Sequence, residues 1–336
     1  MSTNDTNNIV SYSLAYSAKF AILIAFEIPS ILVSILIFAH FGWNRHTPIK
    51  DHNHSILVLL AVNFVQVTTD LPMPMHFFHL NGIVQPPTSA YCTWWVWYEF
   101  SLNTINGCLM AWISIERHIL IFHSVFLRNL GTQKRRLLRI VPLVLCIIWG
   151  PIYYCIVVIF SPMCENTRYF DSLLCGLPCY LMTSWGTFDL FFDVISPVLI
   201  ISIFNLALFV RVIKQSLVVV GRVQNNWRKQ RKLALQLGMI SFAYLAVWIP
   251  LSIGQLGQNY INPNFLLVQS DTFNFLVYLV PLVLPIVCLM SMHEVIINFK
   301  SRLFRQNRTM VMPVNDSTGQ RQTRSFVLAK TATSKF

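Results

Sequence analysis

The sequence predicts an all-α protein, a bundle of seven transmembrane helices with a short amphipathic eighth helix. Its 336 residues are 55% hydrophobic and only 11% charged, which is too apolar for an ordinary soluble domain. A bilayer is crossed by about 20 apolar residues in a helix. Apolar stretches long enough to do so lie at 20–41, 55–80, 91–122, 139–160, 183–217, 233–257 and 268–291.

Basic residues predict how these spans are oriented. Of the 25 Lys and Arg residues, only Lys19 and Arg168 lie in segments expected outside; the others lie near 42–54, 117–139 and 211–232 and after 292. Because cytoplasmic loops carry the excess of Lys and Arg, we expect a plasma-membrane protein with its N-terminus extracellular and its C-terminus cytoplasmic. The net charge of +12 is then explained by the basic residues that orient the spans in the membrane, and it gives no reason to expect a nucleic-acid partner.

Three regions follow from this reading. Residues 1–19 are an extracellular tail with a glycosylation sequon at Asn4, residues 20–291 form the transmembrane domain, and residues 292–336 form the amphipathic helix and a cytoplasmic tail. Ser and Thr residues in that tail are candidate phosphorylation sites through which arrestin would bind.

The third span, Tyr91 to Phe122, carries an unusual polar stripe. Its members recur every three or four residues and therefore share one helix face: Glu99, Asn103, Asn106, Met110, Ser114 and Arg117. A helix with this much polar surface does not face lipid on all sides. We therefore expect other helices to pack around it.

Four cysteines lie in segments expected outside. They are Cys92, at the start of the third span, and Cys164, Cys175 and Cys179 in the loop before the fifth span. An even number in an oxidising compartment predicts two disulfides, for which three pairings exist. A bridge from Cys92 would hold the loop over the bundle, and Cys175 or Cys179 is the favoured partner because both lie nearer the next span.

The joint order of several motifs resembles that of rhodopsin-like (class A) G protein-coupled receptors. The motifs are Cys92, Glu116-Arg117-His118 25 residues later, Trp149 in span four, Pro197 in span five and Trp248-Ile249-Pro250 in span six. The resemblance extends over all seven spans and the amphipathic segment. It implies a receptor that activates a heterotrimeric G protein and is not an enzyme, with no cofactor and no metal site.

The resemblance also implies an activation switch. Glu116, Arg117 and His118 correspond to the family's triplet at the inner end of span three, where the arginine changes partners on activation. Tyr244, Trp248 and Pro250 correspond to the hinge of span six, and Pro285 to the proline of the span-seven motif. Two departures stand out: Asn63 replaces a buried aspartate, and the span-seven motif has lost both of its polar ends.

Acidic residues in the outer halves of spans predict the ligand. Glu99 lies seven residues after Cys92, where amine receptors of the resembled family keep an aspartate, and Asp189 and Asp193 match pocket-facing positions of span five. Carboxylates beside aromatic rings suit a cationic ligand, a short neuropeptide or an amine. Asn103, Trp248 and Asp271 complete the expected site. The alternative is that these acids form structural hydrogen-bond networks.

Two other functional classes stay open at this point. A cation transporter or channel would use the intramembrane acids as an ion path, but such folds are built from duplicated halves, which the sequence does not show. The altered span-two and span-seven motifs keep a second alternative, a receptor homologue that binds ligand without signalling.

Overall fold

The structure, a computed structural model, describes residues 3–43, 54–122, 131–160, 164–218, 224–262 and 264–291. All regular elements within these ranges are helical, and no strand occurs in them. The segment expected to form the amphipathic eighth helix and the cytoplasmic tail lies outside the described residues.

Six of the described helical segments are long and apolar enough to cross a membrane: Ser13–Gly42, His54–His79, Gln133–Ile159, Ser184–Arg211, Gly238–Tyr260 and Gln269–Met290. The chain is therefore a helical membrane bundle of the multi-pass kind. Each segment corresponds to one of the predicted spans. The remaining predicted span, 91–122, lies in helix α4 (Ser89–Phe122), which has the length but not the apolar character of the other six.

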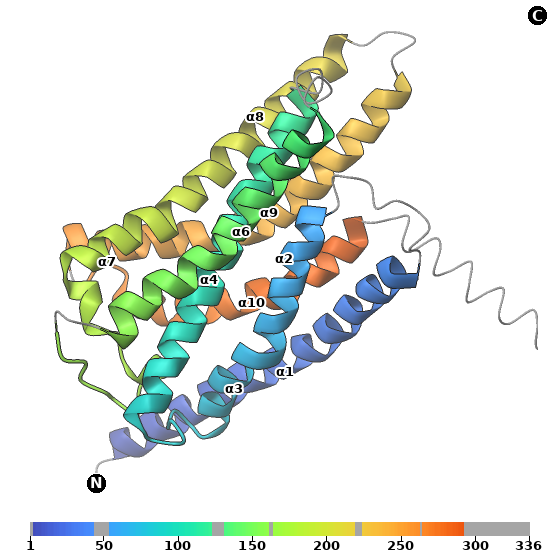
Figure 1. Ribbon diagram of the computed structural model, residues 1–336. Coiled ribbons are helices and arrows are strands. Elements are labelled where there is room, and N and C mark those ends of the chain that lie inside the picture. Colours follow the sequence, from blue (N-terminus) through green and yellow to red (C-terminus); the bar gives the residue numbers. More distant parts are fainter. Residues whose placement is uncertain are drawn as a thin grey trace, which may run out of the picture. The chain divides into compact units, whose positions relative to one another are not determined.

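Helix α4 lies at the centre of the bundle. It contacts α2 (His54–Val65), α6 (Thr132–Tyr154), α8 (Ser196–Val218) and α9 (Gln224–Tyr260) (Figure 1). Its many neighbours explain why its polar stripe is tolerated, since Asn106, Ser114 and Arg117 are all buried against protein. The prediction that other helices pack around this segment is confirmed.

The other helices close the bundle around α4. Helix α1 (Thr3–Trp43) packs on α10 (Leu267–Ser291) and on α3 (Pro72–His79), while α10 packs on α9 and α9 on α8. Helix α1 begins at Thr3, well before the predicted span at residue 20, so the segment expected to be a tail is helical. The Asn4 sequon lies in this first turn, and its side chain is not among those described.

Three of the spans contain a π-helical turn: η2 (Gln66–Asp70), η3 (Cys155–Ile159) and η6 (Leu190–Ile195). The cause of η2 is visible in the sequence. Pro72 has no N–H to donate to the carbonyl four residues earlier, and the Leu71 N–H bonds instead to the Gln66 carbonyl. Thr69 and Thr68 donate their hydroxyls to the Val65 and Phe64 carbonyls. The extra residue turns Asp70 into the bundle.

Candidate functional site

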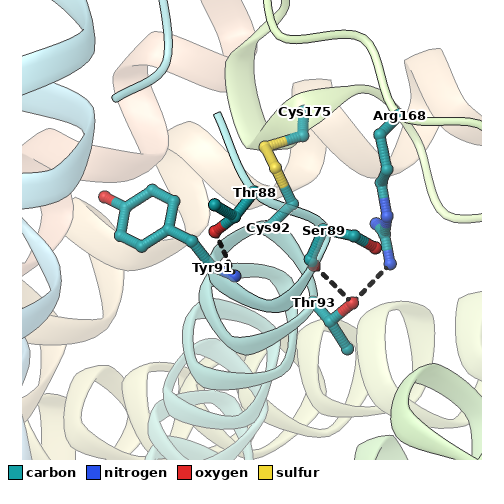
Figure 2. The surroundings of a disulfide bond; sticks show 7 residues. All are labelled: Thr88, Ser89, Tyr91, Cys92, Thr93, Arg168 and Cys175. Atoms are coloured by element: carbon teal, nitrogen blue, oxygen red, sulfur yellow. Dashed lines mark hydrogen bonds between the residues drawn. A yellow bond between two sulfur atoms is a disulfide. The ribbon is translucent and has the colours of Figure 1, made fainter. Parts of the chain in front are cut away.

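Two disulfides mark one end of the bundle, called here the disulfide end. Cys92, in the first turn of α4, is bonded to Cys175 with a Cα–Cα distance of 5.7 Å (Figure 2). Cys164 is bonded to Cys179 with a Cα–Cα distance of 6.1 Å. The prediction of two bridges, one tying the loop to α4, is confirmed. Cys175 is one of the two favoured partners of Cys92, whereas Cys179 closes a short loop with Cys164.

Arg168 adds a second tie between this loop and α4. Its Nη2 donates to the Thr93 hydroxyl at 2.7 Å, and that hydroxyl donates in turn to the Ser89 carbonyl at 2.9 Å (Figure 2). Partial burial lowers the pKa of Arg168, because desolvation disfavours the charged form. The loop is thus held to the start of α4 by a covalent bond and a hydrogen-bond chain.

Glu99 lies on α4 two helical turns after Cys92 and is buried where α4 meets α10. Its carboxylate accepts hydrogen bonds from the Trp95 indole at 3.0 Å and from the Tyr278 hydroxyl at 2.7 Å. Asp70, on η2, is close enough to Glu99 to interact with it electrostatically. The two residues are 1% (Asp70) and 4% (Glu99) exposed, and neither forms an ion pair with a basic residue in the described part of the chain.

Asp70 is the less satisfied member of this pair. Both of its carboxyl oxygens are buried without a geometrically good hydrogen bond from the described residues. Gln66 lies beside it and interacts with its carboxyl group, but the Gln66 amide also donates to the Asn103 carbonyl oxygen at 2.9 Å. A buried carboxylate costs several kcal/mol unless it is paired or protonated. Two buried carboxyl groups this close together are therefore stable only when at least one of them is protonated or paired with a cation.

Below the acidic pair lies a small polar cavity between α2, α4, α9 and α10. Asn103, Asn106 and Gln66 line it on one side, and Tyr244 and Trp248 on another. Asn106 donates to the Gln66 side chain at 2.6 Å, while its own carbonyl oxygen is buried without a donor in the described residues. The space open to the centre of a water molecule is about 10 Å³, room for about one water.

Asn63 of α2 bonds to the backbone of α10 at this junction. Its amide donates to the Pro281 carbonyl at 2.8 Å. In a regular helix that carbonyl would accept from residue 285, but Pro285 has no N–H. Asn63 therefore supplies the donor that the two prolines of α10 leave missing.

Asp189 and Asp193 lie in a second cluster, directed toward α6. Asp189 accepts hydrogen bonds from the hydroxyls of Tyr154 at 2.7 Å and Tyr180 at 3.0 Å, and Asp193 accepts one from the Trp149 indole at 2.7 Å. Neither aspartate lines the cavity. Their surroundings match the alternative reading of these acids as a structural hydrogen-bond network.

Asp271, the remaining acid predicted for the site, is separate from both clusters. Its side chain is 85% exposed and lies 3.5 Å from the Lys19 ammonium. Lys19 also lies over the rings of Tyr16, Phe78 and Phe275. Of the residues predicted for the ligand site, the structure therefore brings Asn103 and Trp248 together at the cavity, with Glu99 nearby. The other three predicted acids, Asp189, Asp193 and Asp271, do not line this cavity.

Of the predicted hinge residues, Tyr244 and Trp248 line the cavity and Pro250 does not. The Tyr244 and Trp248 rings stack with their centroids 5.5 Å apart. A β-carbon added at Gly107 of α4 would come within 2.8 Å of the Tyr244 hydroxyl, so glycine is what lets this tyrosine approach α4. Pro250 and Pro285 lie inside α9 and α10 respectively.

The opposite end of α4, called here the arginine end, holds the Glu116-Arg117-His118 triplet. The Glu116 carboxylate pairs with Arg139 of α6, with Nε and Oε1 3.2 Å apart, and also interacts electrostatically with Arg117. Arg117 is only 4% exposed. The His118 ring packs edge-on against Phe204 of α8 at 5.1 Å. Glu116 therefore sits between two guanidinium groups.

Some residues of the acidic site escaped the sequence prediction. Asp70 was visible as an acid within an apolar span. The side of the helix on which it lies depends on the π-helical turn η2, which the hydrophobic periodicity does not reveal. Asn106 belonged to the polar stripe of α4. Tyr278 gave no signal, because a single tyrosine within an apolar segment belongs to no motif or polar stripe.

No model of a known protein family matches the chain, and no curated protein matches it. A functional argument therefore rests on the residues of this chain and on their geometry.

Proposed function

We propose that the protein is a plasma-membrane receptor that binds an extracellular cationic ligand at Glu99 and Asp70 and activates an intracellular heterotrimeric G protein. The resemblance to rhodopsin-like receptors motivates the proposal, and two adjacent buried carboxyl groups without a basic partner among the described residues carry it. The ligand is an amine or a short basic peptide.

In this proposal α4 is the third of seven spans, in addition to the six apolar segments, and the disulfide end faces outward. Disulfides form in oxidising compartments, and both bridges lie at the same end of the bundle. The basic residues Lys134, Arg135, Arg136 and Arg139 lie at the start of α6, near the arginine end, as the positive-inside rule requires of a cytoplasmic side.

The acidic pair supports a cationic ligand because it carries two carboxyl groups and neither has a basic partner among the described residues. Glu99 is already oriented by two donors, Trp95 and Tyr278, so its carboxylate needs little rearrangement to receive a cation. Asp70 has free acceptor capacity. An ammonium or guanidinium group that reached both would gain charge-assisted hydrogen bonds in a low-dielectric site.

The arginine end supports a switch. Glu116 has two cationic neighbours, Arg117 and Arg139, so loss of one contact is compensated by the other. Such an exchange gives two states that differ by little free energy, which is what a ligand needs in order to shift a population. Tyr244 and Trp248, at the cavity below the acidic pair, lie on α9, which packs on both α8 and α10.

The test is nucleotide exchange on a panel of G proteins in membranes that contain the receptor, with a library of amines and basic peptides. Glu99→Gln keeps the shape and one acceptor but removes the charge, and we expect ligand potency to fall about 10-fold or more, as for a charged hydrogen bond of 1.5–3 kcal/mol. Asp271→Asn is the matched control, because Asp271 is an exposed acid outside the site.

Arg117→Ala separates signalling from binding, since it is expected to abolish exchange and leave ligand binding in place. Equal losses in Glu99→Gln and Asp271→Asn would refute the assignment of the site. A ligand that binds without exchange on any G protein would favour the non-signalling homologue, and ion flux through the intramembrane acids would favour the transporter or channel.

A further inference from the structure

A second cavity opens at the arginine end, on the side of the bundle where α4 and α6 meet. It is lined by α4 between Trp112 and Leu120 and by α6 between Arg135 and Arg139, and the space open to the centre of a water molecule is about 30 Å³. It is separate from the polar cavity below Glu99, with which it shares no residue.

The α6 wall of this cavity is basic. Arg135 and Arg139 lie four residues apart, so they share one helix face, and both line the cavity while remaining partly exposed. Lys134 and Arg136 lie on the same turn but are exposed and outside the cavity. Two guanidinium groups at one opening suit a phosphate, which guanidinium groups bind through paired hydrogen bonds.

Glu116, the partner of Arg139, lines the α4 wall of the cavity. The rest of the α6 wall is apolar and continues into the membrane-spanning surface of α6. Leu138 lines the cavity and is 39% exposed, and Val141 and Leu145, which follow it along α6, are 42% and 61% exposed. This stripe extends from the arginines toward the middle of the span Gln133–Ile159. A molecule with a phosphate at one end and a hydrocarbon chain at the other matches this order.

Trp112 supplies an independent observation. It lines the cavity, and its indole N–H is buried with no acceptor among the described residues. An unpaired buried donor is unfavourable, and an acceptor oxygen from a bound molecule would satisfy it. The cavity therefore has donors on both of its walls.

We propose that this cavity binds an anionic phospholipid of the surrounding leaflet, with the headgroup phosphate at Arg135 and Arg139, an ester or phosphate oxygen at the Trp112 indole, and an acyl chain along Leu138, Val141 and Leu145. Basic pockets between membrane helices bind lipid headgroups in this manner. This inference goes beyond the proposed function and depends only on the protein being embedded in a membrane.

The proposal has a consequence for the triplet of α4. Arg139 is the residue that pairs with Glu116. A phosphate at Arg139 competes with the Glu116 carboxylate for the same guanidinium, and Glu116 then turns to its other cationic neighbour, Arg117. Bound anionic lipid would thereby strengthen the Glu116–Arg117 contact.

The experiment measures lipid binding to the purified full chain by native mass spectrometry, with phosphatidylserine, with phosphatidylcholine and with inorganic phosphate as separate additions. Arg135→Gln/Arg139→Gln removes the two charges in the cavity, and Lys134→Gln/Arg136→Gln removes two charges from the same helix outside it. One basic residue near a membrane is worth about fivefold in binding of an anionic lipid. We therefore expect a loss of about 25-fold in the first variant and a much smaller loss in the second.

The single variants Arg135→Gln and Trp112→Phe keep the test usable if loss of the Glu116–Arg139 pair impairs folding. Each is expected to weaken phosphatidylserine binding severalfold. Equal losses in the two double variants would mean that only diffuse surface charge attracts the lipid, and would overturn the proposal. Equal binding of phosphatidylcholine, or displacement of phosphatidylserine by millimolar phosphate, would also overturn it. None of these readouts uses a receptor ligand or a G protein.

Discussion

Helix α6 approaches the central helix closely at Gly150, and replacing this glycine with alanine tests the packing directly. A β-carbon at this position would lie 2.9 Å from the Ser101 carbonyl oxygen and 3.4 Å from the Thr104 β-carbon. The first of these is a backbone atom in the middle of a helix, so it moves only if α4 moves. Small residues that let two backbones approach closely are typical of helix contacts in membranes.

The magnitude follows from two opposed contributions. Alanine in place of glycine within a helix contributes about 0.5–1 kcal/mol of stability. Forcing one extra carbon into a well-packed contact costs about 1–3 kcal/mol. The net effect expected for Gly150→Ala is destabilisation of about 1 kcal/mol, with α6 displaced from α4.

Gly254→Ala is the matched control, because Gly254 lies in the membrane span of α9 and a β-carbon there would meet nothing within 4 Å. Gly254→Ala has the same stabilising effect of alanine within a helix but no steric clash. The two variants should therefore differ by about 1–3 kcal/mol, or several degrees in the Tm of the detergent-purified protein at about 2–4 °C per kcal/mol. The same Tm for both variants would refute the close approach of α4 and α6.

Three further changes test other contacts, each by the Tm of the purified protein. Asn63→Ala leaves the Pro281 carbonyl without a donor and should cost about 1–3 kcal/mol; a neutral effect would mean that water replaces the amide. Tyr180→Phe removes one donor to Asp189 and should cost about 1 kcal/mol, and an unchanged Tm would argue against this bond. Cys164→Ser opens a loop with a sequence separation of 15 and should cost about 3 kcal/mol, a prediction that fails if wild type and variant melt together.

Much of the bundle could be predicted from the sequence because its causes are local. The six apolar segments follow from hydrophobic runs of sufficient length, and the central position of α4 follows from a polar stripe with helical spacing. The disulfide partner of Cys92 could be narrowed to two loop cysteines from the number and location of the cysteines. Each of these inferences needs only the composition and periodicity of one segment.

The candidate site was less predictable, because carboxylates that are similar in the sequence have different neighbours in the structure. Glu99 and Asp189 were both expected at one ligand site. The structure directs Glu99 toward Asp70 and Tyr278, and Asp189 toward Tyr154 and Tyr180. Periodicity identifies the residues that share a face of one helix, but it does not identify the helix that this face meets.

The sequence by itself determined that the chain forms apolar membrane helices, that the loop before α7 is disulfide-bonded, and that one helix with a polar face lies among the others. Only the tertiary structure decided that Asp70 turns toward Glu99, that Asn63 donates to the Pro281 carbonyl, and that Arg139 reaches Glu116. The physical reason is that each of these contacts depends on the rotation of one helix about its axis relative to another. A π-helical turn or a missing proline N–H changes that rotation without changing the hydrophobic pattern.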